Sequence, residues 1–183
     1  RGFLLALFLS FFLMFLLEFK KKKNFVWLII FVTPILAFAP VIIEYLFLSR
    51  IESDTIRIVQ IKQVFQNMNF VSLLIGHGFG IGIPVREVHM EIAFLEILHK
   101  QGVLGLLFWF TILAITIKQY FLIKSKTNVS KAFLMSSFFV YLQSFTNPFI
   151  NNPIGMAMVI ISLLCLIQIK KDQNEFININ SNL

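Results

Sequence analysis

The fold is decided by Val103-Leu-Gly-Leu-Leu-Phe-Trp-Phe-Thr-Ile-Leu-Ala-Ile-Thr-Ile-Lys-Gln-Tyr-Phe-Leu-Ile123. A helix needs about 20 apolar residues to cross the hydrocarbon core of a bilayer, and this stretch has that length, with its one charge, Lys118, near the end. The whole chain is 58% hydrophobic and 14% charged, with a mean hydropathy of +0.85. A soluble domain is about 45–50% apolar. The chain is therefore predicted to be an integral membrane protein.

Similar apolar stretches lie on both sides of this one. The predicted spans are residues 3–17, 25–48, 103–123, 132–149 and 153–169. We predict an all-α fold: a polytopic transmembrane helix bundle that forms a single membrane domain, with a large helical loop at 49–102 and a polar tail at 170–183. The chain opens with Arg1 and enters an apolar run at once, so we expect residues 1–183 to be a C-terminal fragment of a longer protein.

Lysines gather in the short loops, at Lys20–Lys23, around Lys124–Lys131, and at Lys170 and Lys171. Basic residues in short loops mark the cytoplasmic side of a membrane. This pattern predicts the bacterial inner membrane, with residues 49–102 in the periplasm and the tail in the cytoplasm. The net charge of +7 then sets orientation, and no nucleic-acid partner is expected. The one cysteine, Cys165, excludes an internal disulfide and a thiolate metal cage.

Before the deciding span lies a turn with glycines at alternate positions, Gly76-His-Gly-Phe-Gly-Ile-Gly82. The spacing fits neither the dinucleotide fingerprint G-x-G-x-x-G nor a P-loop, which needs Gly-Lys-Ser/Thr. Glycine backbone bends sharply and approaches a ligand closely, and its N–H groups can form an anion-binding nest. Gly76, Gly78, Gly80 and Gly82 are therefore candidates to bind a substrate pyrophosphate. The alternative is a re-entrant turn without a ligand, in which His77 is only a turn residue.

The pattern of residues 88–101 predicts a helix that Gly102 ends. His89, Ala93, Glu96 and Lys100 would share one face of it. A histidine above a small alanine leaves room for a substrate hydroxyl, whereas Glu96, seven residues on, would be too far from His89 for direct contact. The alternative is a solvated polar stripe. A metal site is not expected, because His89 and His99 have no third ligand at a suitable spacing.

Residues 56–67 predict an amphipathic helix. Ile58, Ile61, Val64 and Phe65 would form its apolar face, with Arg57 and Lys62 off that face. In one interpretation the helix lies on the membrane surface with its charges among the headgroups. In the other, Arg57 faces a pocket and binds a phosphate through two parallel hydrogen bonds.

These features together resemble the C-terminal half of the O-antigen ligase and O-antigen polymerase family of bacterial envelopes. The family pattern is an arginine-bearing helix, a glycine-rich turn, and then a histidine followed at set spacing by Leu, Gly and Gly. The chain supplies Arg57, the turn at 76–82, and His89, Leu95, Gly102 and Gly105, within a match covering about residues 25–169. It departs from the family where Met90 follows His89, since Asn is frequent there.

The resemblance implies a glycosyltransferase that needs neither metal nor cofactor and acts on the outer face of the inner membrane. The donor would be a glycan on undecaprenyl pyrophosphate. The acceptor would be another lipid-linked repeat unit in a polymerase, or a lipid A core sugar of lipopolysaccharide in a ligase. Nucleotide sugars are cytoplasmic, so an outward-facing site requires a donor that has already crossed the bilayer with its leaving group attached.

In this interpretation the catalytic residues are His89, Arg57, Arg86 and Glu96. Arg57 and Arg86 would neutralise the departing pyrophosphate. His89 would take the proton of the acceptor hydroxyl, because an imidazole exchanges protons near neutral pH. Glu91 or Glu96 would orient it.

A transporter or flippase-like protein of lipid-linked glycans, without catalysis, is the rival hypothesis. Pro34 and Pro40 interrupt a span that also holds Glu44, as a transport pathway could require. A flippase would carry ionisable residues at mid-membrane in several spans, whereas this chain has nearly all of them at the edges of its spans.

Overall fold

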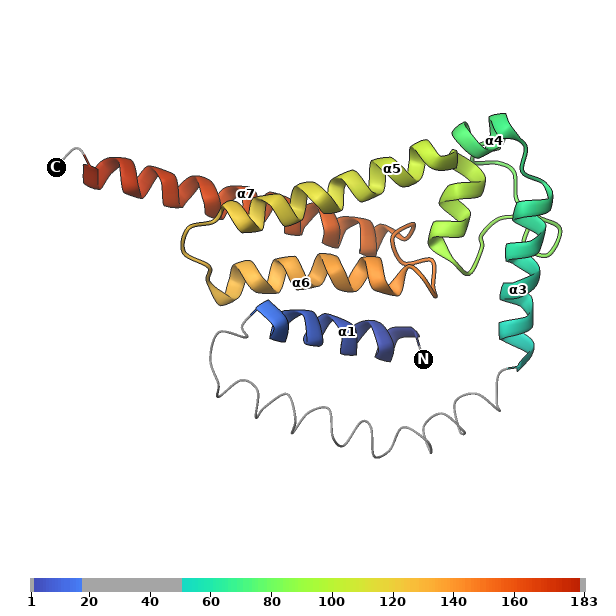
Figure 1. Cartoon of the computed structure of the whole chain (residues 1–183), viewed down its shortest axis with the longest axis horizontal. Helices are drawn as coiled ribbons and strands as arrows, with labels where there is room; N and C mark the ends of the chain where they lie inside the picture. The colour runs from blue at the N-terminus through green and yellow to red at the C-terminus, as the bar shows by residue number, and fades with distance from the viewer. Residues whose placement is uncertain (1, 18–50, 182–183) are drawn as a thin grey trace.

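The computed structural model describes residues 2–17 and 51–181, and Figure 1 shows its helices. They are α1 (Gly2–Leu17), α3 (Ile51–Gln66), α4 (Phe70–Ile75), α5 (Ala93–Leu122), α6 (Asn128–Gln143) and α7 (Pro153–Ser181). The described part contains no strand, only an isolated bridge between Ile83 and Arg86. The all-α prediction is confirmed for these residues. The predicted span 25–48, with Pro34, Pro40 and Glu44, lies outside them, as does Lys20–Lys23.

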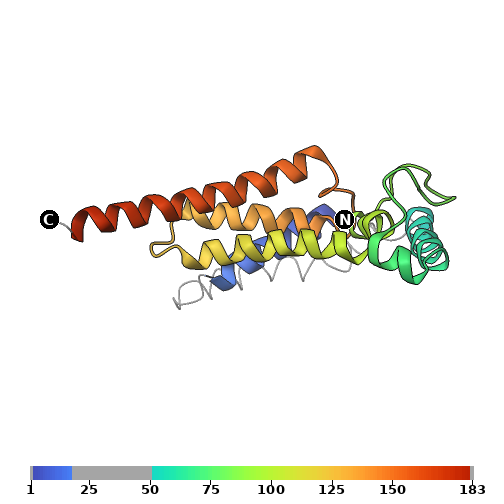
Figure 2. The same cartoon turned by 90° about the horizontal axis from the view of Figure 1, so that it is seen from above.

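Helices α1, α5, α6 and α7 lie side by side as a bundle (Figures 1 and 2). One buried cluster, around Phe94, Trp109 and Tyr141, fills the end nearest α3 and α4. A second, around Tyr120, Leu134 and Leu166, fills the other end. Among the described helices, two are long and apolar enough to cross a membrane, within Ala93–Leu122 and Pro153–Phe176. α1 is apolar but shorter.

Helix bounds differ from the apolar pattern at two places. α6 begins at Asn128, where the side chain of Thr127 accepts the N–H of Ser130 at 3.2 Å, and it ends at Gln143 rather than 149. Ser144 closes it, since its hydroxyl accepts the N–H of Ile150 at 3.0 Å and so folds the following residues into a turn. α7 does not stop at the apolar boundary near residue 169 but continues through the polar tail to Ser181.

Gly102 interrupts α5, as predicted. Its backbone, at φ 67° and ψ −164°, lies in a region open essentially to glycine alone. Gly76, which ends α4, has nearly the same conformation, φ 77° and ψ −174°. A Cβ on Gly102 would overlap the carbonyl of Leu74, and one on Gly76 would overlap the backbone of Lys100. The two chain segments therefore cross backbone against backbone, which fixes the glycine turn beside the bend of α5.

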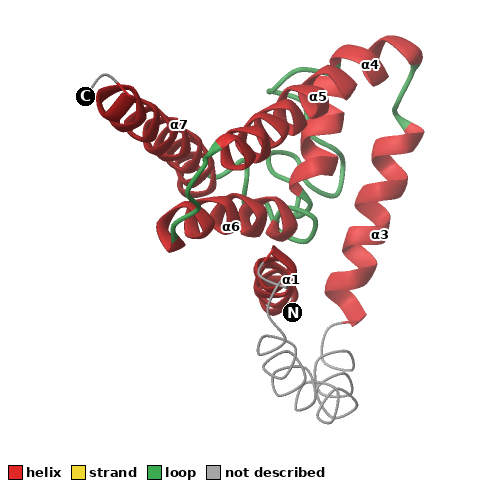
Figure 3. Cartoon of the chain, turned by 60° about the vertical axis from the view of Figure 1, so that its left-hand side comes forward, coloured by secondary structure: helices red, strands yellow, loops and turns green. Residues whose placement is uncertain are grey.

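Helix α3 runs across the direction of the bundle helices (Figures 1 and 3). Its apolar residues Ile58 and Phe65 are exposed, at 67% and 58%, whereas Gln60 and Val64 are fully buried. The predicted apolar face is thus turned outward except for Val64. The cause is hydrogen bonding, because the Gln60 side-chain oxygen accepts the N–H of Glu91 at 3.0 Å and so docks α3 on the loop through its polar side.

The bundle gives the predicted topology a direct test. Asn67 and Ser125 are both exposed and lie at opposite ends of the bundle. In the full-length protein without Cys165, we expect Asn67→Cys to react with a membrane-impermeant maleimide in intact cells. Ser125→Cys should react only after the inner membrane is permeabilised. The reverse order of labelling would place residues 51–102 in the cytoplasm and contradict the predicted orientation.

Candidate functional site

Residues 88–92, which the sequence pattern predicted as the first turn of a helix, form a non-helical segment with bends instead. α5 begins only at Ala93, and Ile92 before it is extended at φ −102° and ψ 111°. Met90 is buried in a small core with Val64, Ile83 and Leu95. Burying this side chain under α3 requires the segment to leave the helix axis. The prediction that His89 shares a helical face with Ala93 and Glu96 is therefore wrong.

His89 nevertheless contacts Glu96 directly, because residues 88–92 lie against the first turns of α5. The His89 Nδ1 lies 3.2 Å from Glu96 Oε1, and Lys100 Nζ lies 2.6 Å from the same oxygen. The other carboxylate oxygen accepts the N–H of Met90 at 3.3 Å. Lys100 also donates to the carbonyl of Val88 at 2.6 Å. The expectation that Glu96 is out of reach of His89 is thus corrected.

The burial of this group separates the roles of its members. The side chain of Glu96 is 5% exposed and that of His89 is 76% exposed. Burial raises the pKa of the Glu96 carboxyl, but the hydrogen bonds from Lys100 and His89 and the charge of Lys100 lower it more, so the pKa lies below its ordinary value. An ionised Glu96 accepts a hydrogen bond from Nδ1–H of His89. When the ring is neutral and Nδ1 carries the hydrogen, Nε2 has the free lone pair and can act as the acceptor. The His89 side chain is exposed.

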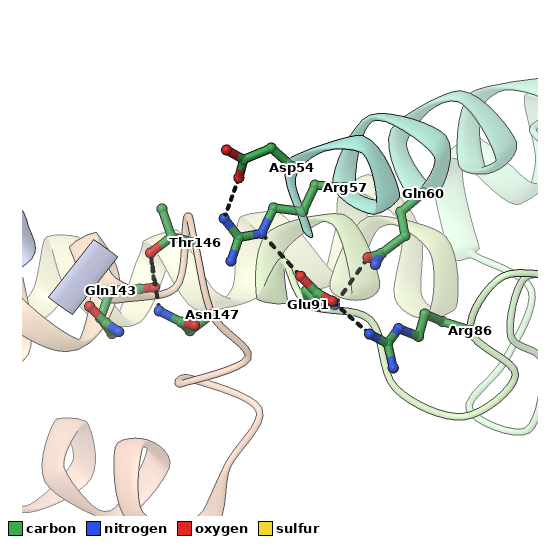
Figure 4. A network of polar contacts seen from close by, with 8 residues as sticks. All are labelled: Asp54, Arg57, Gln60, Arg86, Glu91, Gln143, Thr146 and Asn147. Atoms are coloured by element: carbon green, nitrogen blue, oxygen red, sulfur yellow. Dashed lines mark hydrogen bonds and ion pairs between the residues drawn. The ribbon is translucent and has the colours of Figure 1, made fainter. Parts of the chain in front are cut away.

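Arg57 and Arg86 meet at a second carboxylate, Glu91, as Figure 4 shows. Arg57 Nε lies 3.1 Å from Glu91 Oε2, and Arg86 Nη2 lies 2.6 Å from Glu91 Oε1. Asp54 is 3.3 Å from Arg57 Nη1. The four charges balance. Both arginine side chains remain partly open to solvent, at 30% and 44% exposure.

The structure thus brings together residues that are distant in the sequence, while their catalytic roles remain predictions. Glu96, not Glu91, orients His89, and Glu91 joins the two arginines. Sequence reasoning missed Gln60, whose oxygen holds the backbone of Glu91. Gln60 could have been found from its position, because it lies three residues after Arg57 on the same face of the helix.

The four glycines of the turn fall into two pairs. Gly76 and Gly82 lie against backbone, because a Cβ on Gly82 would overlap the carbonyl of Glu87. Gly78 and Gly80 have no atom within 4 Å of such a Cβ. The N–H groups of His77 and Gly78 donate to the carbonyls of His99 and Lys100, at 2.8 and 3.0 Å. Two N–H groups of the turn are therefore bonded to the backbone of α5, and pyrophosphate binding by the four glycines stays a prediction.

His77 and His99 stack, with ring centroids 4.5 Å apart. The ring nitrogens of His77 face two carbonyl oxygens, of His99 at 3.1 Å and Asn67 at 3.2 Å, so both donate only when the ring is protonated. His99 is 1% exposed, and burial together with the charge of His77 lowers the pKa of its ring. In the described part of the chain, no three His, Cys, Asp or Glu side chains are placed to hold a metal ion.

Comparison with known proteins agrees with the resemblance. The chain is 34% identical, along 100% of its length, to a protein of Shigella flexneri named O-antigen polymerase. It spans 45% of that protein's length. No family model and no solved structure matches the chain. The resemblance is thereby confirmed as a similarity along the whole chain to part of a protein named O-antigen polymerase.

Proposed function

We propose that this chain carries the reacting residues of a membrane glycosyltransferase of the O-antigen polymerase type. The observation that carries the proposal is the exposed ring of His89, whose Nδ1 is held by the buried carboxylate of Glu96. The guanidinium groups of Arg57 and Arg86 both contact Glu91, which lies two residues after His89 in the sequence. A base beside a pair of anion-binding groups is what transfer from a pyrophosphate requires. The name of the homologue supports the same chemistry.

The reaction follows from these positions. Nε2 of His89 takes the proton from a hydroxyl of the acceptor sugar, and that oxygen forms a bond to the anomeric carbon of the donor. The bond from this carbon to the pyrophosphate oxygen breaks, and the leaving group keeps the electron pair. Arg57 and Arg86 stabilise the growing negative charge on undecaprenyl pyrophosphate. Glu96 stabilises the imidazolium formed, as a buried carboxylate does in other acid–base pairs.

The arginine pair can bind an anion although carboxylates already balance its charge. A guanidinium has five N–H donors. Arg57 uses its Nε and Nη1 edges, and Arg86 uses Nη2. Further donors on both groups are left for phosphate oxygens. In this proposal Glu91 holds the two forks at a fixed separation, so little ordering is needed when the pyrophosphate arrives.

The acceptor and the membrane are part of the proposal. The homologue's name favours a polymerase, whose acceptor is a lipid-linked repeat unit, over a ligase, which uses the lipid A core. The exposed apolar residues Ile58, Phe65 and Phe70 beside the arginines suit the boundary of a bilayer. We place the site at headgroup depth on the periplasmic face of the inner membrane, where a lipid pyrophosphate lies.

Arg57→Lys tests this function. The charge is kept but the planar fork is lost, and a charge-assisted hydrogen bond contributes about 1.5–3 kcal/mol. We expect polymer formation to fall by about tenfold or more in a deletion strain that depends on the full-length variant, read as the surface glycan ladder. Lys62→Ala, which removes an exposed charge from the same helix, should leave the ladder unchanged.

The pattern of the remaining glycan separates the two acceptors. A polymerase defect leaves single repeat units on the cell surface, whereas a ligase defect leaves lipid-linked polymer in the membrane. A wild-type ladder from Arg57→Ala would remove the arginine from the reaction.

A further inference from the structure

A cavity of about 150 Å³ lies where α5 bends. Its walls come from four parts of the fold: the glycine turn, both halves of α5, the turn after α6, and α7. The lining residues are Phe79, Glu96, Ile97, Lys100, Gln101, Trp109, Asn151 and Met156. The bend at Gly102 makes the cavity possible. It turns the two halves of α5 toward each other, so that residues 96–101 before the bend and Trp109 after it line the same space.

Trp109 contributes a donor that has no hydrogen-bond partner among the described residues. Its ring is 7% exposed, and the indole Nε1 is buried without a hydrogen bond. A buried indole N–H is normally bonded, since leaving it unpaired is costly. The residue is held in place, because the hydroxyl of Tyr141 donates to the Trp109 carbonyl and the ring packs in the core cluster with Phe94. Trp109 therefore lines the cavity with a ring that is held in place and that carries an unpaired N–H.

The other polar groups define what the cavity can bind. Glu96 accepts and Lys100 donates, and the two cancel in charge across 2.6 Å. The amides of Gln101 and Asn151 do both. An anion would meet the carboxylate of Glu96, and an apolar ligand would offer no partner to these polar groups. A mixed set of donors and acceptors with no net charge matches a ring of hydroxyl groups, and the volume, that of about five waters, suits one sugar ring.

Phe79 supplies an aromatic face at the edge of this cavity. It is 76% exposed and stands between Gly78 and Gly80, the two glycines of the turn that pack against nothing. The exposed ring can lie against the C–H face of a sugar bound in the cavity.

We propose that this cavity is the subsite for one sugar ring of the acceptor glycan. The inference rests on the proposed function and adds a substrate position to it. Glu96 connects the two sites, because the carboxylate that lines the cavity also holds His89 at 3.2 Å. A sugar bound there places its neighbouring hydroxyl close to the base.

The probe is the repeat-unit oligosaccharide released from the organism's own lipid-linked precursor by mild acid. Its binding to the full-length protein in vesicles is measured by equilibrium dialysis. Trp109→Phe keeps the aromatic ring but removes the N–H, and we expect the dissociation constant to rise about fivefold, as for one lost hydrogen bond. Met156→Phe fills the cavity and should abolish binding. Ile160→Phe, on the same helix and outside the lining, should bind as the wild type does.

Transfer assays on the same vesicles separate this inference from the proposed function. If both hold, Trp109→Phe raises KM for the acceptor and leaves KM for the lipid pyrophosphate donor unchanged. The subsite would be overturned if wild type, Trp109→Phe and Met156→Phe bound the oligosaccharide equally well. Transfer by the wild type would still uphold the proposed function in that case. Binding that Met156→Phe abolishes, in a protein that transfers no glycan, would uphold the subsite and overturn the function.

Discussion

Replacing His89 by alanine is expected to reduce glycan transfer by about 10²–10⁴-fold, the usual contribution of a general base. The ring is 76% exposed and contributes little packing, so expression and membrane insertion should not change. His89→Gln keeps a side-chain amide able to donate to Glu96 but has no basic nitrogen. It should lose as much activity as alanine, which distinguishes a base from a side chain that only supports the loop.

The measurement is transfer by the full-length protein in vesicles, with a lipid pyrophosphate donor and a chelator present. Glu87→Ala, an exposed carboxylate in the same segment, should retain activity. His99→Ala is unsuitable as a mild control, because His99 is fully buried and stacked on His77. Equal rates for wild type and His89→Ala would remove His89 from the reaction. Loss of wild-type transfer through the chelator alone would contradict metal-independent chemistry.

Gly102→Ala and Gly76→Ala should each prevent residues 51–102 from folding correctly. Both backbones lie at positive φ in a region that costs other residues about 1–3 kcal/mol, and a Cβ at either position would overlap the backbone of the crossing segment. The overlap adds to the conformational cost because main-chain atoms cannot rotate away. The expected result is a large loss of folded protein and of transfer together.

Gly80→Ala is the matched control. It lies in the same turn, has no positive φ, and would place its Cβ in open space. Thermal unfolding of the full-length variants in detergent, followed by size-exclusion chromatography, gives the comparison. If Gly102→Ala unfolds at the same temperature as Gly80→Ala, the backbone crossing does not stabilise the loop.

Much of the local structure could be predicted because local chemistry determines it. Apolar runs of sufficient length form helices suited to a bilayer, whatever their neighbours, and α1, the second half of α5, and the first part of α7 follow the predicted spans. Gly102 broke the helix as expected. The family resemblance also needed only the order and spacing of residues, and the homologue confirmed it.

The tertiary structure decided what contacts at a distance control. Residues 88–92 have a helical pattern, yet they are not helical, because Met90 is buried and Lys100 donates a hydrogen bond to the Val88 carbonyl. Glu91 and Glu96 are chemically alike, and only the fold decides that Glu91 contacts the arginines and Glu96 contacts His89. The apolar pattern of α3 did not reveal its inward face, because buried glutamine hydrogen bonds determine it. Sequence alone determined where the long apolar helices form, since that depends on near neighbours. The candidate site depends on segments brought together by folding, and local pattern does not encode those pairings.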